Sequence, residues 1–112
     1  MKYNKLVRDR IPEIIEKNGA KAVTRTLTDE EYKVYLEKKL DEEVAEYHES
    51  KDITELVDIL EVVYALCFAN GWSLHTLNAK RANKLYERGA FTQKILLIET
   101  IEKAERSNSE NE

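Results

Sequence analysis

The stretch ELVDILEVVYALCFA, residues 55–69, constrains the fold of this chain most, because it reads as an apolar helix that carries acidic residues. Its apolar positions leave almost no face for water, and a helix that is apolar all round is normally buried. Yet Glu55, Asp58 and Glu61 recur at three-residue steps within it. A buried helix with a line of carboxylates needs a compensating partner, and that partner must lie in whatever packs beside it.

Length and composition restrict the class of protein. The 112 residues suit one domain, which we expect to cover residues 1–105, followed by a polar, disordered tail over 106–112. The net charge of −4 argues against a general nucleic-acid binder. The single cysteine, Cys67, implies no disulfide and is typical of a reducing cytosol. No apolar run is long enough to span a membrane, so we expect a cytoplasmic protein that binds neither a membrane nor a nucleic acid polymer.

Start and stop signals divide the chain into helices. Pro12 suits the first turn of a short helix that ends at Asn18-Gly19, and Thr28 stands three residues before Glu31 in a capping-box spacing. Further helices are predicted over about 29–49, 53–69 and 74–88. Residues 21–27 suit an extended connector or a short strand, and 91–105 could be extended or helical. The fold class is therefore predicted as all-α, an antiparallel helical hairpin with flanking helices.

Four carboxylates are expected to face one another across that hairpin. Glu43 and Glu46 are three residues apart before the turn, and Glu55 and Asp58 are three apart after it. Residues at this spacing share a helix face, and a short turn makes the two helices antiparallel. The register that sets Glu46 opposite Glu55 also sets Glu43 opposite Asp58. Carboxylates on facing helices 8–10 Å apart can meet around one ion or two.

Electrostatics then favours a metal. Two like charges about 5 Å apart repel by about 3 kcal/mol at an effective dielectric constant near 20, so several such pairs need compensation. Proton uptake is one remedy, and a divalent cation is another. Because all four side chains offer oxygen, with no His or Cys among them, Mg²⁺ or Mn²⁺ is expected as the cofactor rather than zinc.

An ordinary acidic surface is the alternative for part of this cluster. Lys38 and Lys39 lie four residues before Glu42 and Glu43, the spacing of exposed helical ion pairs. Asp58 is harder to explain in this way, because apolar residues flank it on both sides.

The same residues resemble a known family. EEVAE followed by ELVD is similar to the E-E-x-x-E…E-x-x-D pattern of the MazG-like, all-α nucleoside triphosphate pyrophosphohydrolases. YNKLVRDRIPEII, DILEVVYAL and KLYERGAF resemble a small house-cleaning subgroup that is phosphoribosyl-ATP pyrophosphohydrolase-like. These motifs cover most of residues 3–97 in the family's order. The chain departs from the subgroup at Ala90, where a glycine is usual, and this would strain the loop if that position needed a positive φ.

The resemblance implies Mg²⁺-dependent hydrolysis of a nucleoside triphosphate between its α- and β-phosphates, giving a nucleoside monophosphate and pyrophosphate. Its expected role is the removal of non-standard or excess nucleotides. By motif match the metal ligands are Glu43, Glu46, Glu55 and Asp58, while Glu42 or Glu61 orients the water or supports the ligands. The phosphates are expected to contact Lys5, Arg8, Arg10, Lys84 and Arg88.

Two other functions stay open. One is a true phosphoribosyl-ATP pyrophosphohydrolase of histidine biosynthesis, and the other is a non-catalytic helical module for oligomerisation or regulation. The apolar faces of residues 55–69 that the hairpin leaves free predict at least a homodimer. Its helices would pair into a four-helix-like core, and its nucleotide sites would draw residues from both chains.

Overall fold

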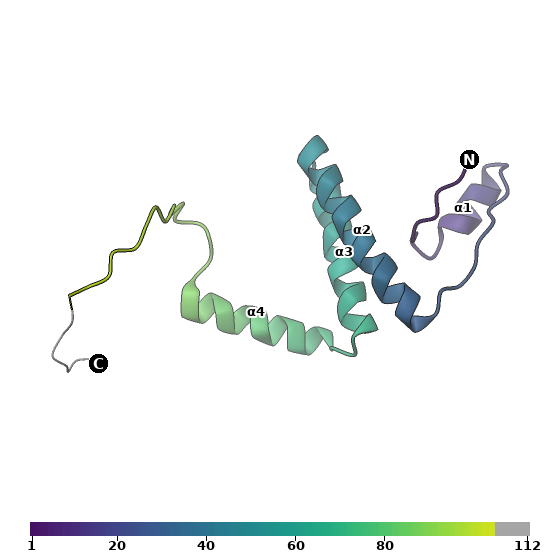
Figure 1. Cartoon of the computed structure of the whole chain (residues 1–112). Coiled ribbons are helices and arrows are strands. Elements are labelled where there is room, and N and C mark those ends of the chain that lie inside the picture. The colour runs from purple at the N-terminus through teal and green to yellow at the C-terminus, as the bar shows by residue number, and fades with distance from the viewer. Residues whose placement is uncertain (105–112) are drawn as a thin grey trace.

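The computed structural model describes residues 1–104, and within them the chain forms α-helices and no strand (Figure 1). The helices are α1 (Ile11–Lys17), α2 (Asp29–Ser50), α3 (Ile53–Ala69) and α4 (Leu74–Arg88). The predicted all-α class is confirmed, and residues 21–27 are a connector rather than a strand. Residues 91–104 contain no helix. The expected tail over 106–112 and residue 105 lie outside the described residues.

The helix ends follow from the capping residues. The Thr28 hydroxyl accepts the Glu31 backbone N–H at 3.1 Å, and the Glu31 carboxylate accepts the Thr28 N–H at 3.0 Å, which completes the capping box of α2. Asp52 and Ser73 cap α3 and α4 by accepting backbone N–H groups two and three residues ahead. Gly89, at φ 82°, ends α4.

Glu31 makes the start of α2 sensitive to acid. Hydrogen bonds from Arg25 and from the Thr28 backbone lower the pKa of Glu31 to about 2. A carboxylate whose pKa is lower in the folded state than in the unfolded state stabilises the fold above its unfolded pKa of about 4.5, and this contribution is lost as the pH falls toward 2. We therefore expect Glu31→Gln to lower the melting temperature by a few degrees at pH 7 and to remove the difference from the parent near pH 2. Thermal melts followed by circular dichroism measure this.

Glu30→Gln, in the same helical turn, is the matched control, because it loses a charge without losing the capping box or the Arg25 ion pair. If the melting temperatures of the parent and Glu31→Gln differ by the same amount at every pH from 7 to 2, Glu31 is not the source of the acid sensitivity.

A two-residue connection joins α2 to α3. Lys51 adopts the left-handed conformation at φ 57° and donates its backbone N–H to the Tyr47 carbonyl at 2.7 Å, and Asp52 then caps α3. The helices therefore run antiparallel and side by side (Figure 1). Leu36 of α2 and Val62 and Cys67 of α3 are the buried hydrophobic residues of the described chain. The core of one chain is thus confined to the hairpin.

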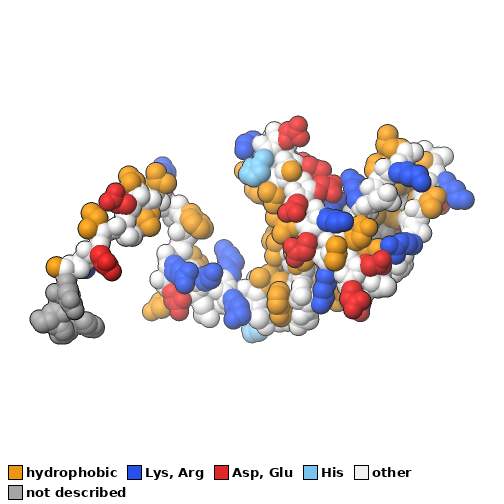
Figure 2. All heavy atoms as spheres, viewed as in Figure 1, with side chains coloured by type: hydrophobic (Ala, Val, Ile, Leu, Met, Phe, Trp, Pro, Cys, Tyr) orange, Lys and Arg blue, Asp and Glu red, His pale blue; other side chains and the backbone are white. Residues whose placement is uncertain are grey.

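The chain after α3 extends away from the hairpin. α4 projects from the end of α3, and the segment after it runs further out (Figure 1). The radius of gyration of 21.2 Å exceeds the roughly 13 Å expected for a globular chain of this length. Large apolar side chains are exposed along α3 and over residues 95–98 (Figure 2). Among the described helices, none combines the length and the apolar character that crossing a bilayer requires.

Ala90 follows the helix end without strain. The residue that adopts a positive φ here is Gly89, and Ala90 is absent from the positive-φ residues of the described chain. The alanine in place of the subgroup's usual second glycine therefore leaves the backbone in an ordinary conformation.

Candidate metal centre

Five carboxylates gather where α2 packs against α3. Carboxylate oxygens of Glu42, Glu43 and Glu46 lie within 4.8 Å of one another on α2. A second group, also within 4.8 Å, joins Glu43 to Glu55 and Asp58 of α3. The hairpin register therefore brings Glu43 next to Asp58, and Glu43 belongs to both groups.

Glu43 is the most unusual member of this cluster. Its side chain is buried, with 5% of the residue exposed, and its Oε1 atom has no hydrogen-bond partner. The other carboxylate oxygen lies 3.2 Å from the Lys39 ammonium. A buried acceptor without a partner costs free energy, and more when it is charged, so Glu43 has an unmet need for a positive or hydrogen-bonding group.

The second group has the composition of a hard-cation site. All its donors are oxygens, as Mg²⁺ and Mn²⁺ prefer. Opposite ligands of an octahedral Mg²⁺ are about 4.2 Å apart, so a group that spans no more than 4.8 Å needs little adjustment to close on one ion. Together with the unpartnered oxygen of Glu43, this shows that the residues present fit a divalent cation.

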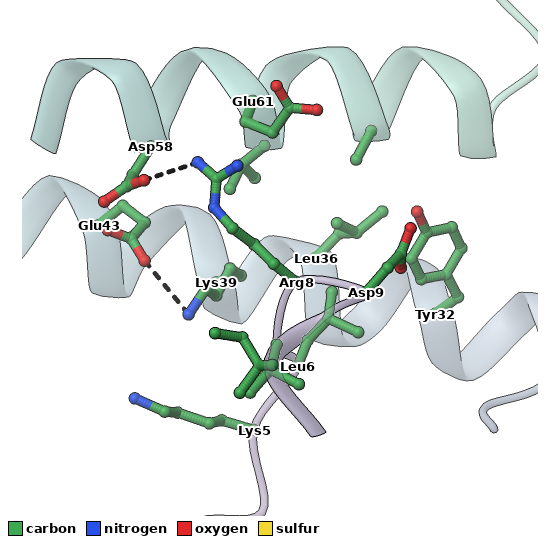
Figure 3. A pocket seen from close by; sticks show the side chains of 14 residues that line it. Lys5, Leu6, Arg8, Asp9, Tyr32, Leu36, Lys39, Glu43, Asp58 and Glu61 are labelled. Carbon is green, nitrogen blue, oxygen red and sulfur yellow. Dashed lines mark hydrogen bonds and ion pairs between the residues drawn. The ribbon is translucent and has the colours of Figure 1, made fainter. Parts of the chain in front are cut away.

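Cationic side chains lie directly against these carboxylates. Arg8 Nη2 contacts Asp58 Oδ1 at 2.7 Å, and Lys5 Nζ contacts Glu42 Oε2 at 3.1 Å. Lys39 Nζ lies 3.5 Å from the same Glu42 oxygen. Figure 3 shows the Arg8 guanidinium reaching from the N-terminal segment to Asp58, between the two helices. The N-terminal segment is thus held to the hairpin through the acidic cluster.

The charges set the pKa values of three groups. Burial alone would raise the pKa of Glu42, but the hydrogen bond from Lys5 and the charges of Lys39 and Lys5 outweigh it and lower that pKa. The same contact with Glu42 raises the pKa of Lys5. The charge of Glu43, followed by desolvation and the charges of Glu42 and Glu55, raises the pKa of Glu46. Glu46 therefore carries repulsion that no cation within residues 1–104 relieves as closely as Lys5 relieves it for Glu42.

A cavity of about 550 Å³ opens beside the cluster, between the N-terminal segment and the hairpin. Glu43, Asp58 and Glu61 line one end, together with Arg8 (Figure 3). The opposite end is formed by apolar side chains and by Tyr32, toward which Asp9 points (Figure 3). The volume lies within the range of small-molecule sites, roughly 300–1,000 Å³.

The structure brings only some of the predicted cations to this cavity. Lys5 and Arg8 line it, whereas Arg10 pairs with Glu13 at 3.1 Å in the first turn of α1. Lys84 and Arg88 lie on α4, which leads away from the hairpin, and they do not line the cavity of their own chain. Sequence motifs give the order of residues along the chain, but they do not show whether a later helix such as α4 lies at the cavity.

The structure distinguishes between Glu42 and Glu61, the two residues expected to orient the water. Glu61 lines the cavity, whereas Glu42 does not, and its Oε2 atom is already shared by Lys5 and Lys39. Arg8 contacts Asp58 of α3 at 2.7 Å.

Sequence reasoning did not assign three lining residues to the site. Lys39 looked like one partner of a surface ion pair, yet it is largely buried and contacts Glu43. The four-residue spacing between Lys39 and Glu43 was the sequence feature that could have indicated this contact. The contact matters for the site because Glu43 is buried. Asp9 and Tyr32 had no comparable signal, because the fold of the N-terminal segment over α2 brings them together.

Comparison with known proteins adds little to this geometry. No family model matches the chain. A protein of Mycolicibacterium smegmatis (strain ATCC 700084 / mc(2)155), described as an uncharacterized protein, is 63% identical over 41 residues, which are 37% of this chain and 42% of that relative. No solved structure matches. The functional proposal therefore depends on the residues of this chain.

Proposed function

We propose that this protein is a Mg²⁺-dependent nucleoside triphosphate pyrophosphohydrolase that cleaves between the α- and β-phosphates and removes non-standard or excess nucleotides. One observation carries the proposal. Glu43, which has a buried and unpartnered carboxylate oxygen, places a carboxylate oxygen within 4.8 Å of ligand atoms of Glu55 and Asp58, beside a cavity that also presents cations. The resemblance of the acidic motifs to MazG-like enzymes agrees with this chemistry.

The charges in the cavity suit a metal–phosphate substrate rather than a free anion. Carboxylates alone would repel a triphosphate. A bound Mg²⁺ would be held by Glu43, Glu55 and Asp58, with Glu46 beside them, and would neutralise charge on the phosphates and the leaving group. Lys5 and Arg8 line the same space and offer donors to phosphate oxygens.

Glu61 is the residue we propose to orient the attacking water. In the reaction, water oxygen bonds to the α-phosphorus, the bond from that phosphorus to the bridging oxygen breaks, and pyrophosphate leaves with the bonding electrons. Glu61 lines the cavity and would accept the water's proton, whereas Glu42 has a lowered pKa and is held by two lysines. Glu42 therefore serves to hold Lys5 and Lys39 in place.

The apolar end of the cavity suits the nucleoside. Tyr32, Leu36 and Ala65 line it, and an aromatic ring next to aliphatic side chains is a suitable surface for a flat base. The Asp9 carboxylate beside Tyr32 would accept a hydrogen bond from an amino or imino group of that base (Figure 3).

We also propose that the active form is at least a homodimer. Ile53, Leu56, Val57 and Leu60 follow a helical repeat along α3 and are exposed in one chain. A second copy of α3 across a two-fold axis would cover this stripe and form the four-helix-like core. Lys84 and Arg88, which do not line their own chain's cavity, would then be available to the partner's site.

The function is tested by direct product analysis. Standard and modified nucleoside triphosphates and phosphoribosyl-ATP are incubated with the protein and Mg²⁺, and pyrophosphate and orthophosphate are measured separately. We expect monophosphate and pyrophosphate in equal amounts from at least one triphosphate, and loss of turnover when the metal is chelated. Incorporation of labelled water oxygen into the monophosphate identifies attack on the α-phosphorus.

Each other result has a definite meaning. Orthophosphate as the sole direct product contradicts α–β cleavage. Turnover of phosphoribosyl-ATP alone supports the enzyme of histidine biosynthesis, and an oligomer that turns over nothing in the panel supports a non-catalytic module.

A further inference from the structure

Arg8 pairs with a carboxylate that belongs to the candidate metal site. Its Nη2 atom lies 2.7 Å from Asp58 Oδ1, across fifty residues of sequence. Asp58 shares the ligand group with Glu43 and Glu55. Within residues 1–104, Arg8 is the cation that lies within ion-pair distance of a carboxylate of α3 in this group. The guanidinium thus balances part of the charge that the cluster carries without a metal.

Other contacts hold the N-terminal segment to the hairpin without the Arg8–Asp58 ion pair. Lys5 is fixed to Glu42, which is not a member of the group that joins α2 to α3. Leu6 and Val7, between Lys5 and Arg8, line the cavity. The Arg8 side chain is about half exposed, so it can change partner while the backbone on either side stays in place.

We propose that Arg8 is an exchangeable internal counter-ion, which pairs with Asp58 in the metal-free protein and moves to the phosphate chain when metal and nucleotide bind. This inference rests on the proposed metal site and function. Two cations bound to one carboxylate repel each other, so metal binding at Asp58 weakens the Arg8 contact. A triphosphate in the same cavity then offers Arg8 new anionic oxygens, to which guanidinium binds in a two-point geometry.

The exchange couples the two ligands. Metal alone must displace Arg8 without providing it with another partner, whereas metal together with nucleotide provides one. Each ligand therefore raises the affinity for the other by the same factor. Removing the guanidinium should strengthen the binding of metal alone and weaken the binding of nucleotide, a pair of opposite effects that a purely structural residue would not produce.

The test measures Mn²⁺ binding by electron paramagnetic resonance in the parent, Arg8→Ala and Arg8→Lys, with and without a non-hydrolysable triphosphate analogue. We expect Arg8→Ala to bind Mn²⁺ alone more tightly, by up to about fivefold, the upper end of the range for loss of a partly exposed ion pair. At saturating Mn²⁺ the analogue should bind to Arg8→Ala about tenfold more weakly than to the parent, because a charge-assisted hydrogen bond is lost. Both affinities of Arg8→Lys should lie between those of the parent and those of Arg8→Ala.

Arg25→Ala is the matched control, since it removes an arginine–carboxylate ion pair with Glu31 away from the cavity. It should change neither affinity by more than twofold. A second readout uses the parent protein: the side-chain N–H resonance of Arg8 should shift on addition of Mg²⁺, and that of Arg25 should not.

Unchanged or weaker Mn²⁺ binding in Arg8→Ala overturns the exchange, as does an Arg8 resonance that ignores saturating Mg²⁺. In either case the proposed function stands, because the parent still binds metal. A parent protein that binds no Mn²⁺ at millimolar concentration overturns the metal site itself, and the exchange with it.

Discussion

Asp58→Asn is expected to reduce Mg²⁺-dependent hydrolysis by about 100-fold or more while leaving the helices intact. Loss of a group that merely supports a metal ligand typically costs 10–100-fold, so loss of a ligand charge should cost at least the upper end of that range. Asparagine keeps the shape of the side chain. The fold should tolerate it, because the repulsion that Asp58 shares with Glu43 and Glu55 disappears together with its ion pair to Arg8.

The measurement compares initial rates of pyrophosphate release and Mn²⁺ affinity, with circular dichroism as the test of folding. Asp52→Asn is the matched control on the same helix. Asp52 caps α3 through the Thr54 N–H at 2.9 Å, and asparagine caps a helix about as well as aspartate. Activity of Asp58→Asn within a few-fold of the parent would mean that Asp58 is not a ligand.

The second large effect concerns association. Light scattering at micromolar concentration should give a mass of at least twice the 13.1 kDa of one chain. Leu60→Glu should shift the protein to monomers and raise the dissociation constant on the order of 10³-fold. Association buries the exposed half of Leu60, which is worth roughly 1 kcal/mol, and a buried glutamate without a partner costs about 1 kcal/mol or more. A two-fold interface contains each residue twice, so the loss is about 4 kcal/mol, and every 1.4 kcal/mol is a factor of ten.

Val23→Glu is the control, because Val23 is 89% exposed on the connector before α2 and lies outside the α3 stripe. It adds the same charge to an exposed apolar position and should leave the mass unchanged. A parent protein that is a stable, active monomer of 13.1 kDa would refute the dimer.

The helices could be predicted because their ends are determined locally. Thr28, Asp52 and Ser73 provide side-chain caps within three residues of the groups they bind, and Gly89 provides a conformation that other residues avoid. The face shared by Glu43 and Asp58 followed from helical spacing and a short turn. These parts of the structure depend on residues that are near one another in sequence.

The arrangement of the cations could not be predicted in the same way. Arg8 meets Asp58 because the N-terminal segment folds over the hairpin, and nothing in the spacing of the two residues indicates that contact. The extended course of residues 91–104 likewise has no local determinant, since their apolar pattern suits either conformation. Packing between segments that are distant in sequence places Arg8, whereas residues 91–104 are exposed along their whole length.

The two-residue connection between α2 and α3 restricts how this site can change in evolution. An α-helix advances about 100° per residue, so a single insertion or deletion within a helix between Glu43 and Asp58 would turn one carboxylate away from the other. With only Lys51 and Asp52 between the two helices, the connection has little length with which to absorb such a change. When the helices themselves lengthen, the facing carboxylates are preserved when each helix gains a whole turn, which adds about seven residues in all. Chains that keep this site should therefore lengthen the distance between their two acidic motifs either by whole helical turns or by a longer loop.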